Sequence, residues 1–314
     1  MVRYQPIDAF RGVSILGMIF FTVTLRLSNN LPDVLKHNVW GTVNLGDFIL
    51  PMFLFASGLS LAYFLKKREE TGKKVVLKDV FLRFAKLSLI GILLSFFSAY
   101  GFLEMDEVML SALLFIACFI LHRLNWKIII GIIFFVNMSY FVLIQYDLLS
   151  IFVGHYLGGY PAALYYLPVM LSGLAIGKGV ISKSLWCGSN QAFMWTTFFS
   201  FLFFVIFIPL NKMTATPSFI MLSILFSFGI FAAIEEIFIR NINLNILQYI
   251  GGKPLRHWLN MYIVFIIPLW FYVEFFNQGA PLSIQWYLSV IISLMLMAVL
   301  YILSRVIDYI TVSD

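Results

Sequence analysis

Three residues that can take part in catalysis lie in one short stretch between two apolar segments: His37, Trp40 and Asp47. An unperturbed histidine has a pKa of about 6.5, so His37 can accept a proton or act as a nucleophile near neutral pH. Asp47 follows ten residues later and can orient the imidazole, as carboxylates do for catalytic histidines. Trp40 can lie against a sugar ring or exclude water. The stretch predicts acid–base or nucleophilic chemistry; the plain alternative is that His37 is a solvated loop residue.

Three basic residues at the ends of apolar segments suit an anionic ligand. Arg11 follows Asp8 by three residues, close enough to pair on one helical face, and its planar guanidinium suits a phosphate. Lys253 and Arg256 follow a Gly-Gly pair, where a helix N-terminus would add to the attraction for a nucleotide phosphate. The alternative is that all three only anchor helix ends. The chain has no GxxxxGK[ST] loop, so nothing predicts nucleotide hydrolysis.

The elements that must position these residues are helices in a membrane. The chain has 314 residues, of which 61% are hydrophobic and 11% charged, and its mean hydropathy is +0.95. No soluble globular domain has this composition, and the apolar runs are continuous, unlike the alternating pattern of a β-barrel. We therefore predict an all-α, polytopic integral membrane protein. Residues 1–314 are expected to form a single transmembrane domain in the lipid bilayer.

Runs with few charges locate the predicted membrane spans. A bilayer core of about 30 Å thickness needs about 20 helical residues. We predict ten transmembrane helices, at about residues 9–27, 46–65, 81–101, 107–122, 127–146, 160–178, 191–210, 217–239, 256–274 and 284–304.

The positive charges predict how these spans are oriented. Ten crossings place both termini on one side, and with cytoplasmic termini 18 of the 21 Lys and Arg residues lie in the cytoplasm. This distribution follows the positive-inside rule and makes the loop of His37 extracytoplasmic. The net charge of +6 belongs to these topology signals, so we expect no nucleic-acid partner. No pair of His, Cys or carboxylate residues has convincing metal-ligand spacing, and we expect no metal.

Three motifs lie in order along the chain, each at an apolar segment or in the loop before it. They are IDAFRG (7–12), HxxW (37–40) with Asp47 and PxFxF (51–55), and PLNK (209–212) with PSF (217–219). Together they resemble the heparan-α-glucosaminide N-acetyltransferase family of transmembrane acyltransferases. The first motif alone is also similar to the start of the acyltransferase-3 group.

The resemblance implies an enzyme that takes acetyl-CoA from the cytoplasm as a co-substrate. It implies that the acetyl group goes to an amino sugar or glycan acceptor on the extracytoplasmic side, and we expect the cell membrane as the location. His37 would be catalytic, either as a base or as a transient acyl carrier, with Asp47 beside it. The sequence leaves the acceptor and a homo-oligomeric state open.

The same resemblance suggests where the two substrates bind. We expect the phosphates of acetyl-CoA at Arg11, Lys253 and Arg256. Three further residues are expected to contact the acceptor, namely Trp40, Asn211 and Lys212. For the last two, capping of their own loop is an equal alternative.

The chain departs from the family pattern close to the expected site. The family usually has Asn-Gly after its tryptophan, where this chain has Gly41 and Thr42, and Thr22 stands where the family has an asparagine. Two other functions remain open. One is a transporter or permease of a small solute, which broken spans near the bilayer midplane would favour. The other is an O-acyltransferase of envelope polysaccharide.

Overall fold

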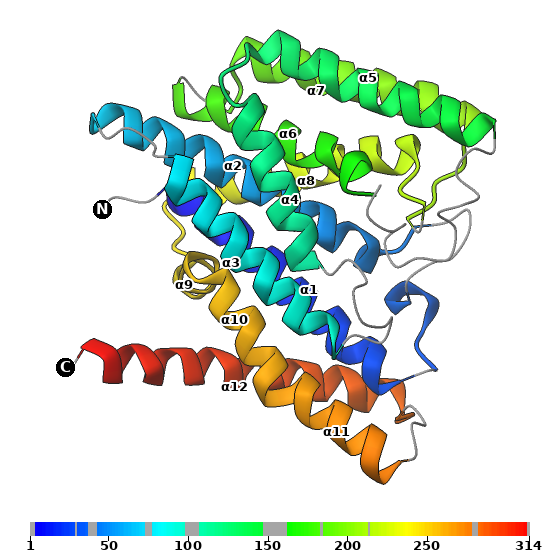
Figure 1. The fold of residues 1–314 in the computed structure, drawn as a ribbon, viewed down its shortest axis with the longest axis vertical. Coiled ribbons are helices and arrows are strands. Elements are labelled where there is room, and N and C mark those ends of the chain that lie inside the picture. Colours follow the sequence, from blue (N-terminus) through cyan, green and yellow to red (C-terminus); the bar gives the residue numbers. More distant parts are fainter. Residues whose placement is uncertain are drawn as a thin grey trace. The chain divides into compact units, whose positions relative to one another are not determined.

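The chain is described by a computed structural model, which covers most of the sequence. Its described residues are 4–28, 30–36, 43–72, 77–97, 107–146, 162–182, 185–212, 214–277 and 282–312. Within these ranges the regular structure is helical and no strand occurs (Figure 1). His37 and Trp40 lie outside the described residues.

Twelve α-helices and three shorter helical segments occur in the described residues. In chain order they are α1 (Gln5–Leu27), η1 (Asp33–Leu35), η2 (Leu45–Phe48), α2 (Ile49–Glu70), α3 (Leu77–Ser95), α4 (Glu107–Leu121), α5 (Trp126–Gln145), α6 (Ala162–Ser182), α7 (Gly188–Phe207), α8 (Pro217–Ile239), α9 (Asn245–Gly252), α10 (Pro254–Met261), η5 (Tyr262–Ile266), α11 (Ile267–Phe276) and α12 (Trp286–Val312).

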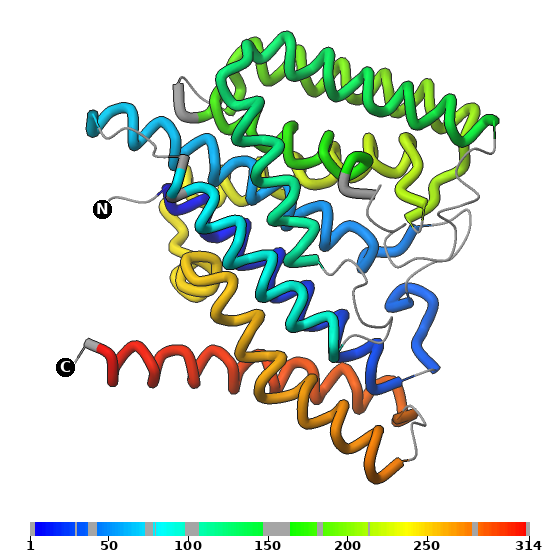
Figure 2. Tube along the Cα trace, in the orientation of Figure 1, coloured from blue at the N-terminus to red at the C-terminus, as the bar shows by residue number. Residues whose placement is uncertain are grey.

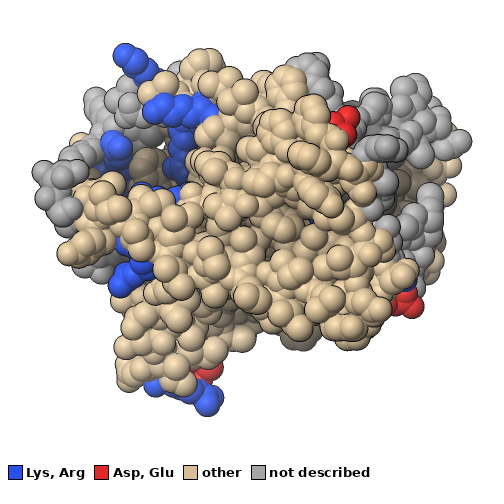
Figure 3. Space-filling model, turned by 90° about the horizontal axis from the view of Figure 1, so that it is seen from below, with Lys and Arg blue, Asp and Glu red and all other residues tan. Residues whose placement is uncertain are grey.

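The described helices confirm a polytopic membrane protein. Seven segments are long and apolar enough to cross a bilayer, and α4 and most of α6 form shorter apolar helices. Each of the ten predicted spans overlaps a helix, although α3 carries four charged residues in its first ten positions. The number of ten crossings and the cytoplasmic termini stay predictions. Figure 3 shows one face of the molecule, on which most described side chains are neither acidic nor basic.

Contacts within the chain group the helices into two compact units. Unit 1 contains residues 1–37, 44–49 and 236–314, and unit 2 contains residues 38–43 and 50–235. Each unit is described by itself below. The expectation that residues 1–314 form one domain stays a prediction.

In unit 1, helix α1 is the element against which the C-terminal helices pack. It contacts α9, α10 and α12. In Figure 1, α10 and α11 continue one another and α12 runs back toward the C-terminus; the tube in Figure 2 shows the same course from gold to red. The C-terminal end of α1 is joined to α12 and the residues just before it by polar contacts, because Thr24 Oγ1 lies 2.8 Å from Ser293 Oγ and Ile284 N–H donates to the Leu27 carbonyl. Unit 1 thus joins the first helix to the last.

Glycine allows α1 and α9 to cross at backbone distance. A Cβ added to Gly251 would lie 1.7 Å from the carbonyl oxygen of Asp8, and one added to Gly12 would lie 2.1 Å from that of Leu247. No side chain fits into such a gap, so the crossing requires glycine on both helices. The crossing places α9 against the first turns of α1.

The ninth predicted span contains a turn of π-helix in the structure. It consists of α10 and α11 with a π-helical turn, Tyr262–Ile266, between them. Pro268 lies in the first turn of α11 and has no N–H for the helical ladder, which accounts for a disturbed hydrogen-bond pattern just before it. The span predicted at about residues 256–274 thus lies within one apolar helical segment, Pro254–Phe276, which is long enough to cross a bilayer and contains a π turn.

In unit 2, helices α2 and α6 cross at small residues in the same manner. A Cβ on Gly58 would lie 2.1 Å from the carbonyl oxygen of Met170. Helix α7 instead presents large apolar side chains outward, with Trp195 62%, Phe199 62% and Ile206 75% exposed. Such an apolar exterior is typical of a helix that faces lipid.

Candidate functional site

The predicted site residues fall in both units. Arg11, Asp47, Lys253 and Arg256 belong to unit 1. Asn211 and Lys212 belong to unit 2. His37 and Trp40, which carry the central prediction, lie outside the described residues. The roles of all these residues stay predictions, and the structure adds the surroundings of those that it describes.

Asp47 is a fully buried carboxylate at the start of the second apolar segment. It lies in η2, where its Oδ2 accepts the backbone N–H of Asn44 at 2.9 Å, and the Asn44 side chain accepts the backbone N–H of Asp47 in return. This reciprocal arrangement is a capping box, which satisfies amides at a helix start. Gly46 of the same turn packs on the ring of Phe21 from α1. The carboxylate is thus held in place against α1.

Asn44 also ties together the two chain segments on either side of residues 37–42. Its side-chain amide donates to the carbonyl oxygens of Asp33 at 2.5 Å and of Lys36 at 2.9 Å. Lys36 directly precedes His37 in the sequence, so the residue before the predicted catalytic histidine is anchored to the turn that contains Asp47. Asn44 was not predicted as a site residue; the sequence signal that could have identified it is an Asn three residues before an acidic residue at a helix start.

Arg11 forms an ion pair with Asp8 on the first turns of α1, as the spacing predicts. Its Nη2 donates to Asp8 Oδ1, and the Arg11 side chain is 18% exposed. Asp8 belongs to the α1–α9 crossing, because Gly251 of α9 lies against its backbone. Arg11 and the end of α9 therefore lie at the same end of unit 1.

Lys253 and Arg256 meet one carboxylate that comes from the last helix. Lys253 Nζ donates to Asp308 Oδ2, and Arg256 Nη1 donates to Asp308 Oδ1. The hydroxyl of Tyr249 also donates to Asp308 Oδ2, at 2.6 Å. The guanidinium of Arg305 lies 5.1 Å from the centre of the Tyr249 ring, within range of a cation–π interaction. We call these five residues the basic cluster.

The basic cluster changes the chemistry of its tyrosine. Burial and the hydrogen bond to Asp308 raise the pKa of Tyr249 to about 12. The phenol therefore stays a hydrogen-bond donor to Asp308 throughout the physiological pH range. The cluster contains three cations, Lys253, Arg256 and Arg305, and one carboxylate, Asp308, so it keeps a surplus of positive charge and can attract an anion.

Tyr249, Arg305 and Asp308 were not predicted as site residues from the sequence. Arg305 and Asp308 stand three positions apart in an otherwise apolar helix, which is the signal that could have identified them. Behind the cluster, His257 is 1% exposed and its Nδ1 lies 3.3 Å from Ser304 Oγ. The end of unit 1 that carries the basic cluster is consequently polar over more residues than the sequence predicts.

In unit 2, Asn211 and Lys212 belong to a tightly bonded loop. The backbone N–H of Asn211 donates to Thr216 Oγ1 at 3.0 Å, and that hydroxyl donates to the Pro209 carbonyl oxygen at 3.1 Å. The side-chain oxygen of Asn211 accepts the N–H of Thr214 at 3.4 Å. Lys212 is 9% exposed. These bonds support loop capping by Asn211, and a contact of either residue with an acceptor stays a prediction.

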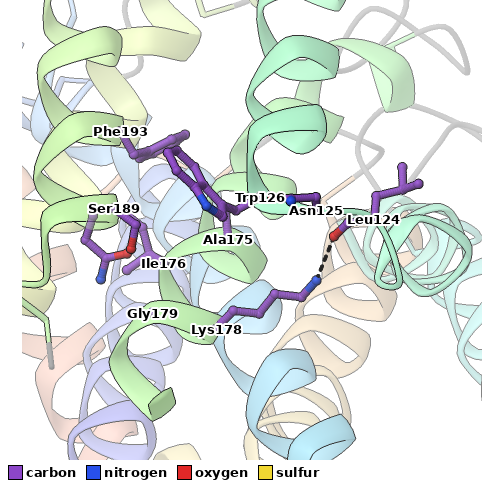
Figure 4. Close-up of a pocket in the computed structure, with 10 residues that line it drawn as sticks. Leu124, Asn125, Trp126, Ala175, Ile176, Lys178, Gly179, Ser189 and Phe193 are labelled. Atoms are coloured by element: carbon purple, nitrogen blue, oxygen red, sulfur yellow. Dashed lines mark hydrogen bonds between the residues drawn. The ribbon is translucent and has the colours of Figure 1, made fainter. Parts of the chain in front are cut away.

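A pocket of about 280 Å³ lies in unit 2, between the starts of α5 and α7 and the second half of α6. Figure 4 shows Trp126 and Phe193 on its wall and Lys178 pointing toward Leu124, whose carbonyl oxygen accepts from Lys178 Nζ at 3.1 Å. Gly179 makes room for the buried side chain of Asn190. None of its lining residues is among the predicted site residues.

Comparison with known proteins identifies a family for most of the chain. The family model described as heparan-alpha-glucosaminide N-acetyltransferase, catalytic, matches residues 3–202, more than half of the 314 residues. The matched region contains Arg11, His37 and Asp47, whereas Lys253, Arg256 and Asp308 lie beyond it. A search of curated proteins found no match.

Proposed function

The chain belongs to the heparan-alpha-glucosaminide N-acetyltransferase family, and we propose that it transfers acetyl groups across a cell membrane. The donor is acetyl-CoA from the cytoplasm, and the acceptor is an amino sugar or glycan on the extracytoplasmic side. Homo-oligomerisation is compatible with this proposal but not required by it. The observation that carries the proposal is the family match over the stretch from His37 to Asp47.

The surroundings of Asp47 support a catalytic role for His37, which lies ten residues before it. A buried, hydrogen-bonded carboxylate can orient an imidazole and stabilise its charged form. Asn44 ties the residue before His37 to the turn of Asp47. A base held in this way gains from a fixed orientation, since misplacement of a catalytic group by about 1 Å can cost about 100-fold in rate.

His37 acts in one of two ways, as a base or as an acyl carrier. As a base, it takes the proton of the acceptor amine while the amine nitrogen attacks the thioester carbonyl; the C–S bond breaks and CoA leaves as a thiolate that is then protonated. As an acyl carrier, an imidazole nitrogen attacks the thioester carbonyl, the C–S bond breaks, and CoA leaves as a thiolate that takes up the imidazole proton. The acceptor amine then attacks the acetyl carbonyl, the bond from acetyl carbon to imidazole nitrogen breaks, and the imidazole takes the proton of the amine. Incubation with labelled acetyl-CoA alone distinguishes them, because only the second leaves label on the protein.

The charges at one end of unit 1 support a donor site there. Arg11, Lys253 and Arg256 are cations suited to the phosphates of acetyl-CoA. Arg11 lies on α1, and Lys253 follows α9, whose Gly251 packs on the same turns of α1. On the acceptor side we propose Trp40, with Asn211 and Lys212 as further contacts.

The test is an acetyl-transfer assay with the purified full-length chain in lipid nanodiscs. Labelled acetyl-CoA is supplied with a panel of acceptors that offer an amine, a hydroxyl or neither. We expect label on the amine acceptors only. If the chain neither transfers acetyl groups nor gains thermal stability from CoA, the proposed function is wrong; label on hydroxyl acceptors instead would make it an O-acyltransferase.

Replacing Asn44 tests whether the hydrogen bonds around the His37 loop matter for turnover. Asn44→Ser keeps a capping side chain for η2 but cannot reach the carbonyl oxygens of Asp33 and Lys36, whereas Asn44→Ala loses both functions. We expect both variants to lower kcat by roughly tenfold, because the loop loses its orientation. Only Asn44→Ala should also lose about 1 kcal/mol of stability.

Steady-state kinetics and thermal unfolding of the two variants separate these effects. If Asn44→Ser keeps the wild-type kcat, the bonds to Asp33 and Lys36 have no role in positioning the loop. The KM for acetyl-CoA should stay near the wild-type value in both variants, because the proposed phosphate contacts involve other residues.

A further inference from the structure

Asp308 forms ion pairs with Lys253 and Arg256, two of the cations that the proposed function assigns to the phosphates of acetyl-CoA. Both of its carboxylate oxygens are engaged, one by Arg256 and the other by Lys253 and Tyr249. The side chains of Lys253, Arg256 and Asp308 are 34%, 36% and 22% exposed. A ligand from solution can therefore reach these ion pairs, but it meets a carboxylate already bound to both cations.

The surplus of positive charge in the basic cluster favours the exchange of Asp308 for a phosphate rather than the exclusion of the phosphate. Two cations, Lys253 and Arg256, bind the Asp308 carboxylate. The charges of Lys253 and of a third cation, Arg305, lie within 5.2 Å of the centre of the Tyr249 ring. Partly exposed ion pairs contribute little to stability, so exchanging them for a phosphate has a small cost. Charge-assisted bonds to a phosphate then replace those to Asp308.

We propose that Asp308 is the resident counter-ion of the donor phosphate site and sets its affinity. This inference rests on the proposed function. When acetyl-CoA binds, Lys253 and Arg256 exchange Asp308 for phosphate oxygens, while Tyr249 keeps its hydrogen bond to the carboxylate. Asp308 thereby weakens the binding of donors that carry phosphates, and has no effect on donors that lack them.

The central variant is Asp308→Asn, which removes one negative charge with little change of shape. We expect it to bind CoA roughly fivefold more tightly than the wild type. The reason is that two partly exposed ion pairs, which compete with the phosphates for Lys253 and Arg256, are lost. Its affinity for acetyl-pantetheine, which has no phosphate, should not change. Higher salt should reduce the gain, because screening acts on the exposed charges.

Glu236→Gln is the matched control, because it also removes a single negative charge from unit 1. Glu236 pairs with Arg240 at 3.0 Å on the exposed end of α8, and this pair includes no residue of the basic cluster. Its CoA affinity should remain within twofold of the wild type. If Glu236→Gln tightens CoA binding as much as Asp308→Asn, the effect is one of overall charge and the proposal is wrong.

Lys253→Gln provides a second measurement that does not depend on the stability of Asp308→Asn. It should weaken CoA binding several-fold and leave acetyl-pantetheine binding unchanged. Binding is measured by titration of labelled CoA against the purified chain in nanodiscs. Unchanged CoA affinity in Lys253→Gln, or equal or weaker affinity in a folded Asp308→Asn, overturns the inference while the wild type still binds CoA. A wild type that binds no CoA overturns the proposed function itself.

Discussion

Replacing His37 by alanine is expected to lower the rate of acetyl transfer by at least about 100-fold. General-base catalysis contributes about 10²–10⁴-fold, and loss of an acyl carrier would remove the reaction path altogether. The KM for acetyl-CoA should change little, because the proposed phosphate contacts lie at Arg11, Lys253 and Arg256. The measurement is transfer from labelled acetyl-CoA to an amine acceptor by the purified variant.

His122→Ala is the matched control for this experiment. It also removes an imidazole, but from the end of α4 in unit 2, where the ring stacks on Phe119. Its backbone carbonyl, which accepts from Lys178, is kept in the variant. We expect wild-type turnover for His122→Ala. Turnover by His37→Ala at the rate of the wild type would show that His37 is not the catalytic residue.

Replacing Gly251 by alanine is expected to destabilise unit 1 by about 3 kcal/mol, the upper part of the usual range for an overpacked core. The added methyl group would lie 1.7 Å from the Asp8 carbonyl oxygen and 2.6 Å from the Gly12 nitrogen, and both are backbone atoms that cannot turn away. The two helices must separate, and Lys253 and Arg11 move apart with them. We expect the Tm to fall by roughly 5 °C or more.

Gly131→Ala and Gly229→Ala are controls for this effect. Nothing lies within 4 Å of a Cβ built at either glycine, and both lie inside helices, α5 and α8. Alanine favours the helix by about 1 kcal/mol over glycine, so these variants should unfold at the wild-type temperature or above it. If Gly251→Ala unfolds at the same temperature as these two controls, the close crossing of α1 and α9 is not a feature of the folded protein.

The sequence predicted the positions of the helices well, because each depends on a local run of apolar residues. All ten predicted spans overlap described helices. It did not predict α9 or the π turn before Pro268, since a short amphipathic helix and a disturbed ladder leave no long apolar run. It also did not predict that the chain groups into two units, which depends on contacts between distant segments.

The site was predictable to a different extent at each residue. Asp47 was recognised from its place before an apolar segment, and the structure adds that Asn44 holds it and the chain before His37. Arg11 and Asp8 were predicted to pair because three positions on a helix bring side chains together. The partner of Lys253 and Arg256 could not be predicted, because Asp308 lies more than 50 positions away.

By itself, the sequence determined that this chain is a helical membrane protein of an acetyltransferase family, because hydropathy and motifs are properties of continuous segments. Only the tertiary structure decided which distant residues meet. The Gly12–Gly251 crossing brings α9 onto α1, and the return of α12 delivers Asp308 to Lys253 and Arg256. The physical reason is that backbone approach and ion pairing depend on distances in space, and these are set by how the helices pack.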